Sequence, residues 1–195
     1  PTLEHYKYAF QQANFGHYIS NTLIVALAST AIVIVTGSLA SYGFARYNIG
    51  GGNLMFFILT TRMMPAIAVV LPFFVIFRSV GGTGIGKFLA LGQDRLGTLV
   101  VCYTIFNLPF AIWLMHSFFQ DIPIELEDSA RLDGYTRFQV FLKVVLPLAG
   151  PGIAGTAIFC LLFSWNEYLF ASILTRDVAK TITVGVGDFW TQRGI

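Results

Sequence analysis

The sequence predicts an all-α fold, that of a polytopic helical membrane protein. Hydrophobic residues make up 55% of the 195 residues and charged residues only 11%, whereas a soluble domain carries about 25% charged residues. The mean hydropathy is +0.70. The apolar residues also gather into long runs, each close to the roughly 20 residues that cross a hydrocarbon core. Too few polar side chains remain to cover a water-facing surface.

Each apolar run predicts a membrane-spanning helix, because only a helix satisfies its own backbone hydrogen bonds in lipid. The first run is uncharged up to Arg46 and contains small residues that suit close helix packing. The second contains a single charge, Arg62, and the third a single histidine, His116. The fourth is uncharged up to Glu167. The expected spans cover about residues 21–45, 54–77, 97–120 and 144–174.

The remaining segments define the expected domain organisation. Residues 1–20 form an extracytoplasmic lead-in, and residues 21–195 form one transmembrane domain whose most charged connection is 121–143. The chain lacks an initiator methionine, so we expect a fragment of a longer protein. If 121–143 is cytoplasmic, most of the other Lys and Arg residues fall on the opposite side, so the positive-inside rule does not favour that orientation.

The charged connection predicts a short helix with recognisable ends. Pro123 suits its first turn, and Gly134 is a natural stop after its last turn. Three acidic residues occupy its N-terminal half, where the helix dipole favours anions. They are Glu125, Glu127 and Asp128.

The same helix is predicted to have two different sides. Glu127 and Arg131 have the spacing of an ion pair on its charged side. The opposite side is small and includes Ser129 and Ala130. Such a helix can lie in the lipid headgroup region without a partner, or it can press closely against another protein. Nothing in it is suited to bond chemistry.

The spacing of this connection resembles the EAA loop of the permeases of binding-protein-dependent ABC importers. Asp128–Ala130 is followed after three residues by Gly134, and after nine more by Val144–Pro147, as in that loop. The wider stretch Pro123–Pro151 is similar to the carbohydrate, maltose-type branch of the family. Two positions depart from the family pattern, since an Asp replaces the usual Glu at 128 and a Ser replaces an Ala at 129.

The resemblance covers nearly the whole chain and implies a MetI-like ABC permease core, with about four spans present of roughly six expected. It implies a subunit that translocates a solute, most simply a sugar, across the cytoplasmic (inner) membrane of a prokaryote. The loop would then couple the permease to an ATPase. The coupling residues implied are Glu125, Glu127, Asp128, Ser129, Ala130, Arg131, Gly134, Leu146 and Pro147.

The resemblance also implies the partners of the chain. Separate nucleotide-binding ATPase subunits would hold ATP and Mg²⁺, so this chain is expected to be no enzyme and to bind no cofactor or metal itself. A second permease subunit, by analogy a different one, would complete the pore. An extracytoplasmic solute-binding protein would deliver the solute, and lipid would surround the spans. No basic stripe suggests nucleic acid.

Four polar residues in or beside the spans are candidates for the solute path. Arg62 either lines that path or links two helices, since a charge inside a span is kept away from lipid. Glu167 either contacts solute or a binding protein, or belongs to an interfacial aromatic belt with Trp165 and Tyr168. The candidates are Arg62, Asn107, Asn166 and Glu167.

Other motifs carry less information. Gly81–Lys87 nearly completes a phosphate-binding loop, but Phe88 occupies the position of the required hydroxyl and no strand precedes it. Cys102 and Cys160 lie in apolar runs and are expected to be core residues. The histidines His5, His17 and His116 are too isolated for a metal site.

Three other functions compete with a sugar permease. The same loop architecture would serve an ABC permease for a polyamine, an amino acid or phosphate. An ion-coupled secondary transporter would need carboxylates inside its spans or broken helices at a repeat interface, and neither is evident. An intramembrane enzyme would need a nucleophile with a base, or a metal cluster, which the spans do not offer.

Overall fold

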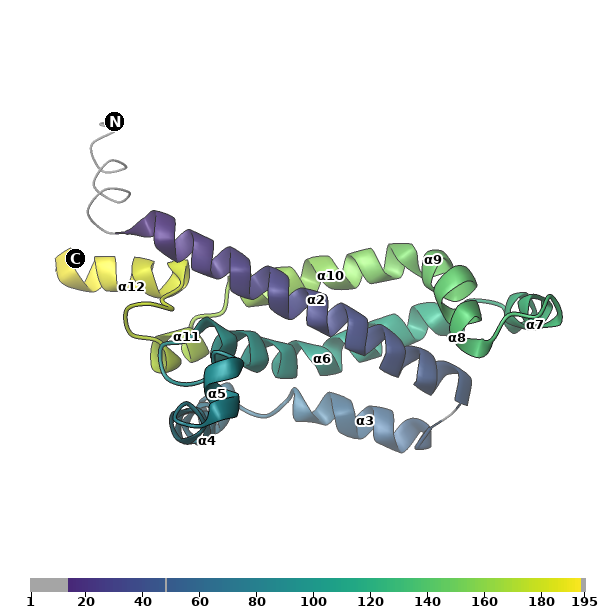
Figure 1. Ribbon diagram of the computed structural model, residues 1–195, viewed down its shortest axis with the longest axis horizontal. Helices are drawn as coiled ribbons and strands as arrows, with labels where there is room; N and C mark the ends of the chain where they lie inside the picture. The colour runs from purple at the N-terminus through teal and green to yellow at the C-terminus, as the bar shows by residue number, and fades with distance from the viewer. Residues whose placement is uncertain (1–13, 48, 194–195) are drawn as a thin grey trace, which may run out of the picture. The chain divides into compact units, whose positions relative to one another are not determined.

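The computed structural model describes residues 14–47 and 49–193, so most of the expected lead-in, with His5, lies outside the described residues. Regular structure within the described residues is helical and includes no strand, which confirms the predicted fold class. Figure 1 shows these helices. They are α2 (Phe15–Tyr47), α3 (Gly51–Thr61), α4 (Ala66–Val80), α5 (Gly84–Phe88), α6 (Leu96–Gln120), α7 (Ile124–Leu132), α8 (Arg137–Val140), the π-helix η1 (Phe141–Val145), α9 (Leu146–Leu148), α10 (Gly150–Trp165), α11 (Leu169–Leu174) and α12 (Ile182–Arg193).

Two helices of the described chain are long and apolar enough to cross a membrane without a break. They are α2 and α6, and they contain the expected spans 21–45 and 97–120. The two other expected spans, 54–77 and 144–174, are each divided into shorter helices. If each bent pair counts as one span, the described chain has up to four.

Proline explains the break inside 54–77. α3 ends at Thr61, and α4 begins after Pro65, which is its N-cap with an extended ψ of 121°. A proline disfavours the helical conformation at the residue before it. Hydropathy does not register this effect, so the apolar run 54–77 predicted one continuous span.

Two prolines and a glycine explain the break inside 144–174. The axis bends by 75° between the segments Arg137–Leu148 and Gly150–Trp165. Pro147 cannot donate to the carbonyl four residues earlier, and its ring would clash with that carbonyl. The wider π turn of η1 lies directly before it. Gly150 and Pro151 follow at the bend, and such residues are the usual cause of sharp kinks.

The described chain divides into two compact units, each with its own packing. The first comprises residues 14–29, 64–105 and 161–193, and the second comprises 30–63 and 106–160. In the first unit, the Asn21 side chain donates to the carbonyls of Val178 and Lys180 at 2.8 and 3.0 Å. The rings of Phe73 and Phe170 meet edge to face, with centroids 6.3 Å apart. The Asn21 bonds hold the connection between α11 and α12 against α2, and the aromatic contact packs α11 against α4.

The second unit has an apolar core that surrounds Tyr42. Its ring lies 4.9 Å from that of Phe141 and 6.0 Å from that of Phe119, measured between centroids. Other buried members of this core are Val33, Ala111, Met115, Ile122, Ala130, Val140, Val145, Ala149 and Cys160. The core therefore reaches from the membrane-length helices to α7 and η1.

Candidate functional site

The helix predicted in the charged connection is α7, and both of its ends form as expected. It begins after Pro123 and carries Glu125 and Glu127 in its first turn. At its other end, Gly134 has a positive φ of 90°. The N–H of Gly134 donates to Arg131 O and that of Tyr135 donates to Ala130 O, which is the Schellman arrangement. The predicted stop at Gly134 is therefore confirmed.

The inner side of α7 is fixed by an ion pair that the sequence analysis did not predict. Glu127 Oε1 accepts from Arg46 Nε at 2.5 Å, and Glu127 Oε2 accepts from the Tyr42 hydroxyl at 2.7 Å. Arg46 Nη2 also donates to Ile122 O at 2.8 Å. The Arg46 and Glu127 side chains are only 9% and 8% exposed. Residues near the end of α2 thus hold both the first turn of α7 and Ile122, two residues before the helix begins.

The expected pair between Glu127 and Arg131 is wrong. Arg131 Nη1 instead lies 3.7 Å from Asp128 Oδ1, and both of these side chains are more than half exposed. Helical spacing permitted either pair. The periodicity of an isolated helix does not include Arg46, whose guanidinium draws Glu127 inward.

The small-residue side of α7 is likewise divided between the interior and the surface. Ala130 is buried in the core of its unit, whereas Ser129 is exposed. Ala130 therefore packs within this chain rather than facing a partner. The exposed side of α7 carries the charges of Asp128 and Arg131 together with three large apolar side chains. These are Ile124, Leu126 and Leu132, which is 89% exposed.

The segment that follows α7 is also well ordered by local contacts. Thr136 and Gln139 form a reciprocal capping box at the start of α8. Phe138 is exposed in α8, and Leu142 is exposed in η1. Leu146, partly buried, packs against the core, and Pro147 follows it in α9. The expected coupling residues thus lie on α7, at Gly134 in the turn that ends it, and on α9.

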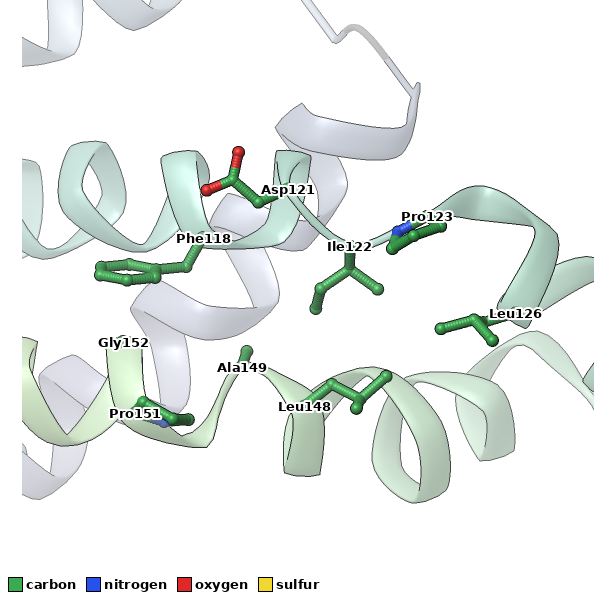
Figure 2. Close-up of a pocket in the computed structure, with 9 residues that line it drawn as sticks. All are labelled: Phe118, Asp121, Ile122, Pro123, Leu126, Leu148, Ala149, Pro151 and Gly152. Carbon is green, nitrogen blue, oxygen red and sulfur yellow. The ribbon is translucent and has the colours of Figure 1, made fainter.

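An apolar groove of about 320 Å³ lies beside the start of α7. Figure 2 shows the ring of Phe118 above Pro151 and Gly152, with Leu126 and Leu148 at the other end of the groove. The carboxylate of Asp121 points away from it. The groove lies between the end of α6, the start of α7 and the bend between α9 and α10. It leaves α7 without continuous packing on this flank.

Two of the four solute-path candidates come together in the second unit. Arg62 Nη1 donates to the carbonyl of Phe106 and to Asn107 Oδ1, the latter at 3.2 Å. The guanidinium also lies over the ring of Phe110, 5.9 Å from its centroid. Asn107 Nδ2 in turn donates to Cys160 O at 3.5 Å. These contacts favour the alternative in which Arg62 links helices.

The other two candidates lie in the first unit. Glu167 accepts from the N–H groups of Phe170 and Ala171, at 2.9 and 3.1 Å, and from the Tyr103 hydroxyl at 3.0 Å. Its carboxylate therefore satisfies the first turn of α11. Asn166 is exposed and donates to Leu162 O. The contacts of Glu167 favour a structural role.

The P-loop-like segment forms no phosphate cradle of the expected kind. Thr83 caps the five-residue helix α5 by accepting from the N–H of Gly86, and the described chain has no strand before it. Phe88 is 88% exposed. Cys102 and Cys160 are buried free cysteines, which confirms the prediction that they are core residues. No cluster of three potential metal ligands occurs within the described residues.

These features define the class of the protein: a polytopic helical membrane protein with an exposed amphipathic helix, α7, anchored between its long helices. Comparison with known families then identifies it more closely. The family model described as the binding-protein-dependent transport system inner membrane component matches residues 33–193. The chain belongs to this family.

Similar proteins include two named sugar permeases and one solved transporter. The chain is 36% identical to the trehalose transport system permease protein SugB of Mycobacterium tuberculosis, over 96% of this chain and 66% of that protein. It is 30% identical to the maltodextrin transport system permease protein MdxG of Bacillus subtilis, over 96% and 65%.

The solved structure is that of a bacterial ABC transporter involved in the import of the acidic polysaccharide alginate. The TM-score is 0.72 at 25% identity, over 93% of this chain and 60% of that one. The chain spans about two thirds of the length of both curated relatives.

Proposed function

We propose that this chain is the transmembrane permease subunit of an ATP-binding-cassette importer in a prokaryotic cytoplasmic membrane. The observation that carries the proposal is α7: a short helix with formed caps, an anchored inner side and an exposed side of mixed charge and apolar surface. A patch of exposed apolar side chains rimmed by polar groups is a feature of protein–protein interaction sites. The spacing from Asp128 through Gly134 to Leu146 and Pro147 supports an ATPase as the partner.

In this proposal, α7 and the exposed residues after it dock on a separate nucleotide-binding subunit. ATP binds more tightly to one arrangement of the ATPase subunits, and that difference in affinity drives the change of state. Two permease subunits follow as rigid bodies, and the solute gains access from the opposite side. This chain contributes movement and a path, and the ATPase contributes the hydrolysis.

We propose a sugar as the solute, delivered by an extracytoplasmic binding protein. Support comes from the similar proteins, whose names refer to trehalose, maltodextrin and alginate. A different permease subunit as the second half of the pore is part of the same proposal. The alternative solutes are polyamines, amino acids and phosphate.

Purification and reconstitution of the full-length protein test this function. The affinity-purified permease is expected to bring down an ATPase subunit. With the solute-binding protein in proteoliposomes, it is expected to show ATP-dependent uptake of a sugar, tested with trehalose and maltodextrins. Uptake of an amino acid or a polyamine instead would contradict the sugar assignment, and absence of any ATPase from the purified material would contradict the importer.

A further inference from the structure

The ion pair beneath α7 has a consequence for energy coupling. We propose that Arg46 and Glu127, assisted by Tyr42, are the positioning residues through which movement of α7 is passed to α2. This inference rests on the proposed function, because it takes α7 as the helix that docks on the ATPase. None of these residues is expected to touch nucleotide or solute, so their role is to hold the docking helix to a membrane-length helix.

The contacts of Arg46 hold α7 at two separate points. Nε donates to the Glu127 carboxylate at 2.5 Å, and Nη2 donates to Ile122 O at 2.8 Å. One planar guanidinium therefore bridges the chain before α7 and a side chain of its first turn. A planar fork with fixed donor directions limits rotation more than a single contact does.

The Tyr42 hydroxyl holds the second oxygen of the same carboxylate. It donates to Glu127 Oε2 at 2.7 Å, so both carboxylate oxygens accept from side chains of α2. Tyr42 itself is packed against Phe119 and Phe141. The ring therefore cannot follow α7 outward without opening the core of this unit.

Burial separates this pair from the other charges of α7. The Arg46 and Glu127 side chains are 9% and 8% exposed, whereas those of Arg131 and Asp128 are 51% and 62% exposed, with a longer separation of 3.7 Å. Water and salt screen an exposed pair. Removing one partner of a buried pair leaves an uncompensated charge, so the buried pair resists separation. Of these two ion pairs, the buried one with Glu127 is therefore the better suited to carry force.

An unbroken α2 can pass this movement along its length. α2 is a single α-helix from Phe15 to Tyr47, with Tyr42 and Arg46 in its last two turns. Its ladder of backbone hydrogen bonds is unbroken, unlike the divided runs that contain α3 and α10. A packed, unbroken helix moves as one body rather than deforming continuously. Displacement of α7 is therefore expected to shift α2 with it.

The test compares solute transported with ATP hydrolysed, in the full-length permease assembled with its ATPase and solute-binding protein. For Glu127→Gln and Arg46→Met, we expect the ATPase to remain bound while the transport-to-hydrolysis ratio falls by about tenfold, within the usual range of coupling between sites. Tyr42→Phe keeps the ion pair and is expected to lower the ratio less. The double variant Arg46→Glu, Glu127→Arg exchanges the two charges and is expected to restore part of the transport-to-hydrolysis ratio.

Asp188→Asn is the matched control. It breaks the 2.6 Å ion pair between Lys180 and Asp188, which lies away from α7 in the chain, and it should leave the ratio unchanged. Loss of transport and hydrolysis in proportion, with an unchanged ratio, would show a merely structural role and overturn the inference. If Arg46→Met fails to fold, Tyr42→Phe and the charge-exchange variant still test the inference. Absence of the ATPase from the wild-type complex would instead overturn the proposed function.

Discussion

Asp94 shows how a single side chain can order a connection. Its carboxylate accepts from the four consecutive N–H groups of residues 176–179, at 2.8 to 3.1 Å. Its own N–H donates to Leu174 O at 2.9 Å, and its φ is 55°. Asp is among the residues that tolerate this left-handed conformation. The segment after α11 is thereby fixed without any helix or strand.

Acid is expected to release this contact. Burial raises the pKa of Asp94, but the four backbone N–H donors outweigh it, and the net pKa lies below the usual value of 3.8. A carboxyl group whose pKa is lowered by folding stabilises the fold above its unfolded pKa, and this contribution is lost as pH falls through the folded pKa. Asp94→Asn should therefore cost about 1 kcal/mol at pH 7, and the difference from wild type should shrink below about pH 4.

Thermal unfolding of the detergent-solubilised protein across this pH range measures the effect. Asp177→Asn is a suitable control. It removes the charge of the neighbouring Asp177 side chain but keeps the bond that the Asp177 backbone N–H donates to Asp94. A constant difference between wild type and Asp94→Asn from pH 7 to pH 3 would contradict the assignment of the stabilisation to the ionised carboxylate.

Individual residues divide into those the sequence could place and those it could not. Gly134 was predictable because a glycine after a helical run satisfies a local backbone requirement. The partner of Glu127 was not, because Arg46 is distant in sequence and enters only through tertiary packing. A signal was present, since Arg46 is a charge that ends a long apolar run. This charge indicated where the helix ends, but it did not indicate which carboxylate Arg46 faces.

At the scale of whole elements, hydropathy placed the apolar segments but not their breaks. The expected runs 21–45 and 97–120 lie within α2 and α6, although α2 begins six residues earlier than the expected run, at Phe15. The runs around Arg62 and Pro147 were divided because proline acts on the backbone of preceding residues, a property that average hydropathy does not measure. The Gly150–Pro151 pair was the available signal for the second bend.

Packing between α6 and α10 gives a prediction about one glycine. A Cβ on Gly152 would lie 2.2 to 2.6 Å from three atoms of the Phe118 ring, so the ring would have to move. Gly152→Ala is therefore expected to destabilise the protein by about 1–3 kcal/mol, as overpacking does. Gly155→Ala, in the same helix, meets no atom within 4 Å and should leave stability nearly unchanged. Thermal unfolding in detergent measures both, and equal effects of the two variants would contradict this packing.

For the molecule as a whole, composition was enough to predict a helical membrane protein. Only 11% of the residues are charged, which is too few to cover a water-facing surface. Its membership of the transport family was predictable from the spacing in one connection together with a resemblance that covers nearly the whole chain. The solute was not, because the polar residues in and beside the spans are engaged in contacts with their own chain. Arg62 and Glu167 are the examples.

Docking of the exposed side of α7 on an ATPase can be measured by site-specific photo-cross-linking in the native membrane. A photoreactive residue replaces Leu132 on α7 or, as control, Phe88 on α5, since these side chains are equally exposed at 89% and 88%. The probe at Leu132 is expected to capture a nucleotide-hydrolysing subunit, and the probe at Phe88 is expected not to. Capture of lipid alone at Leu132, or of the same subunit from both positions, would contradict it.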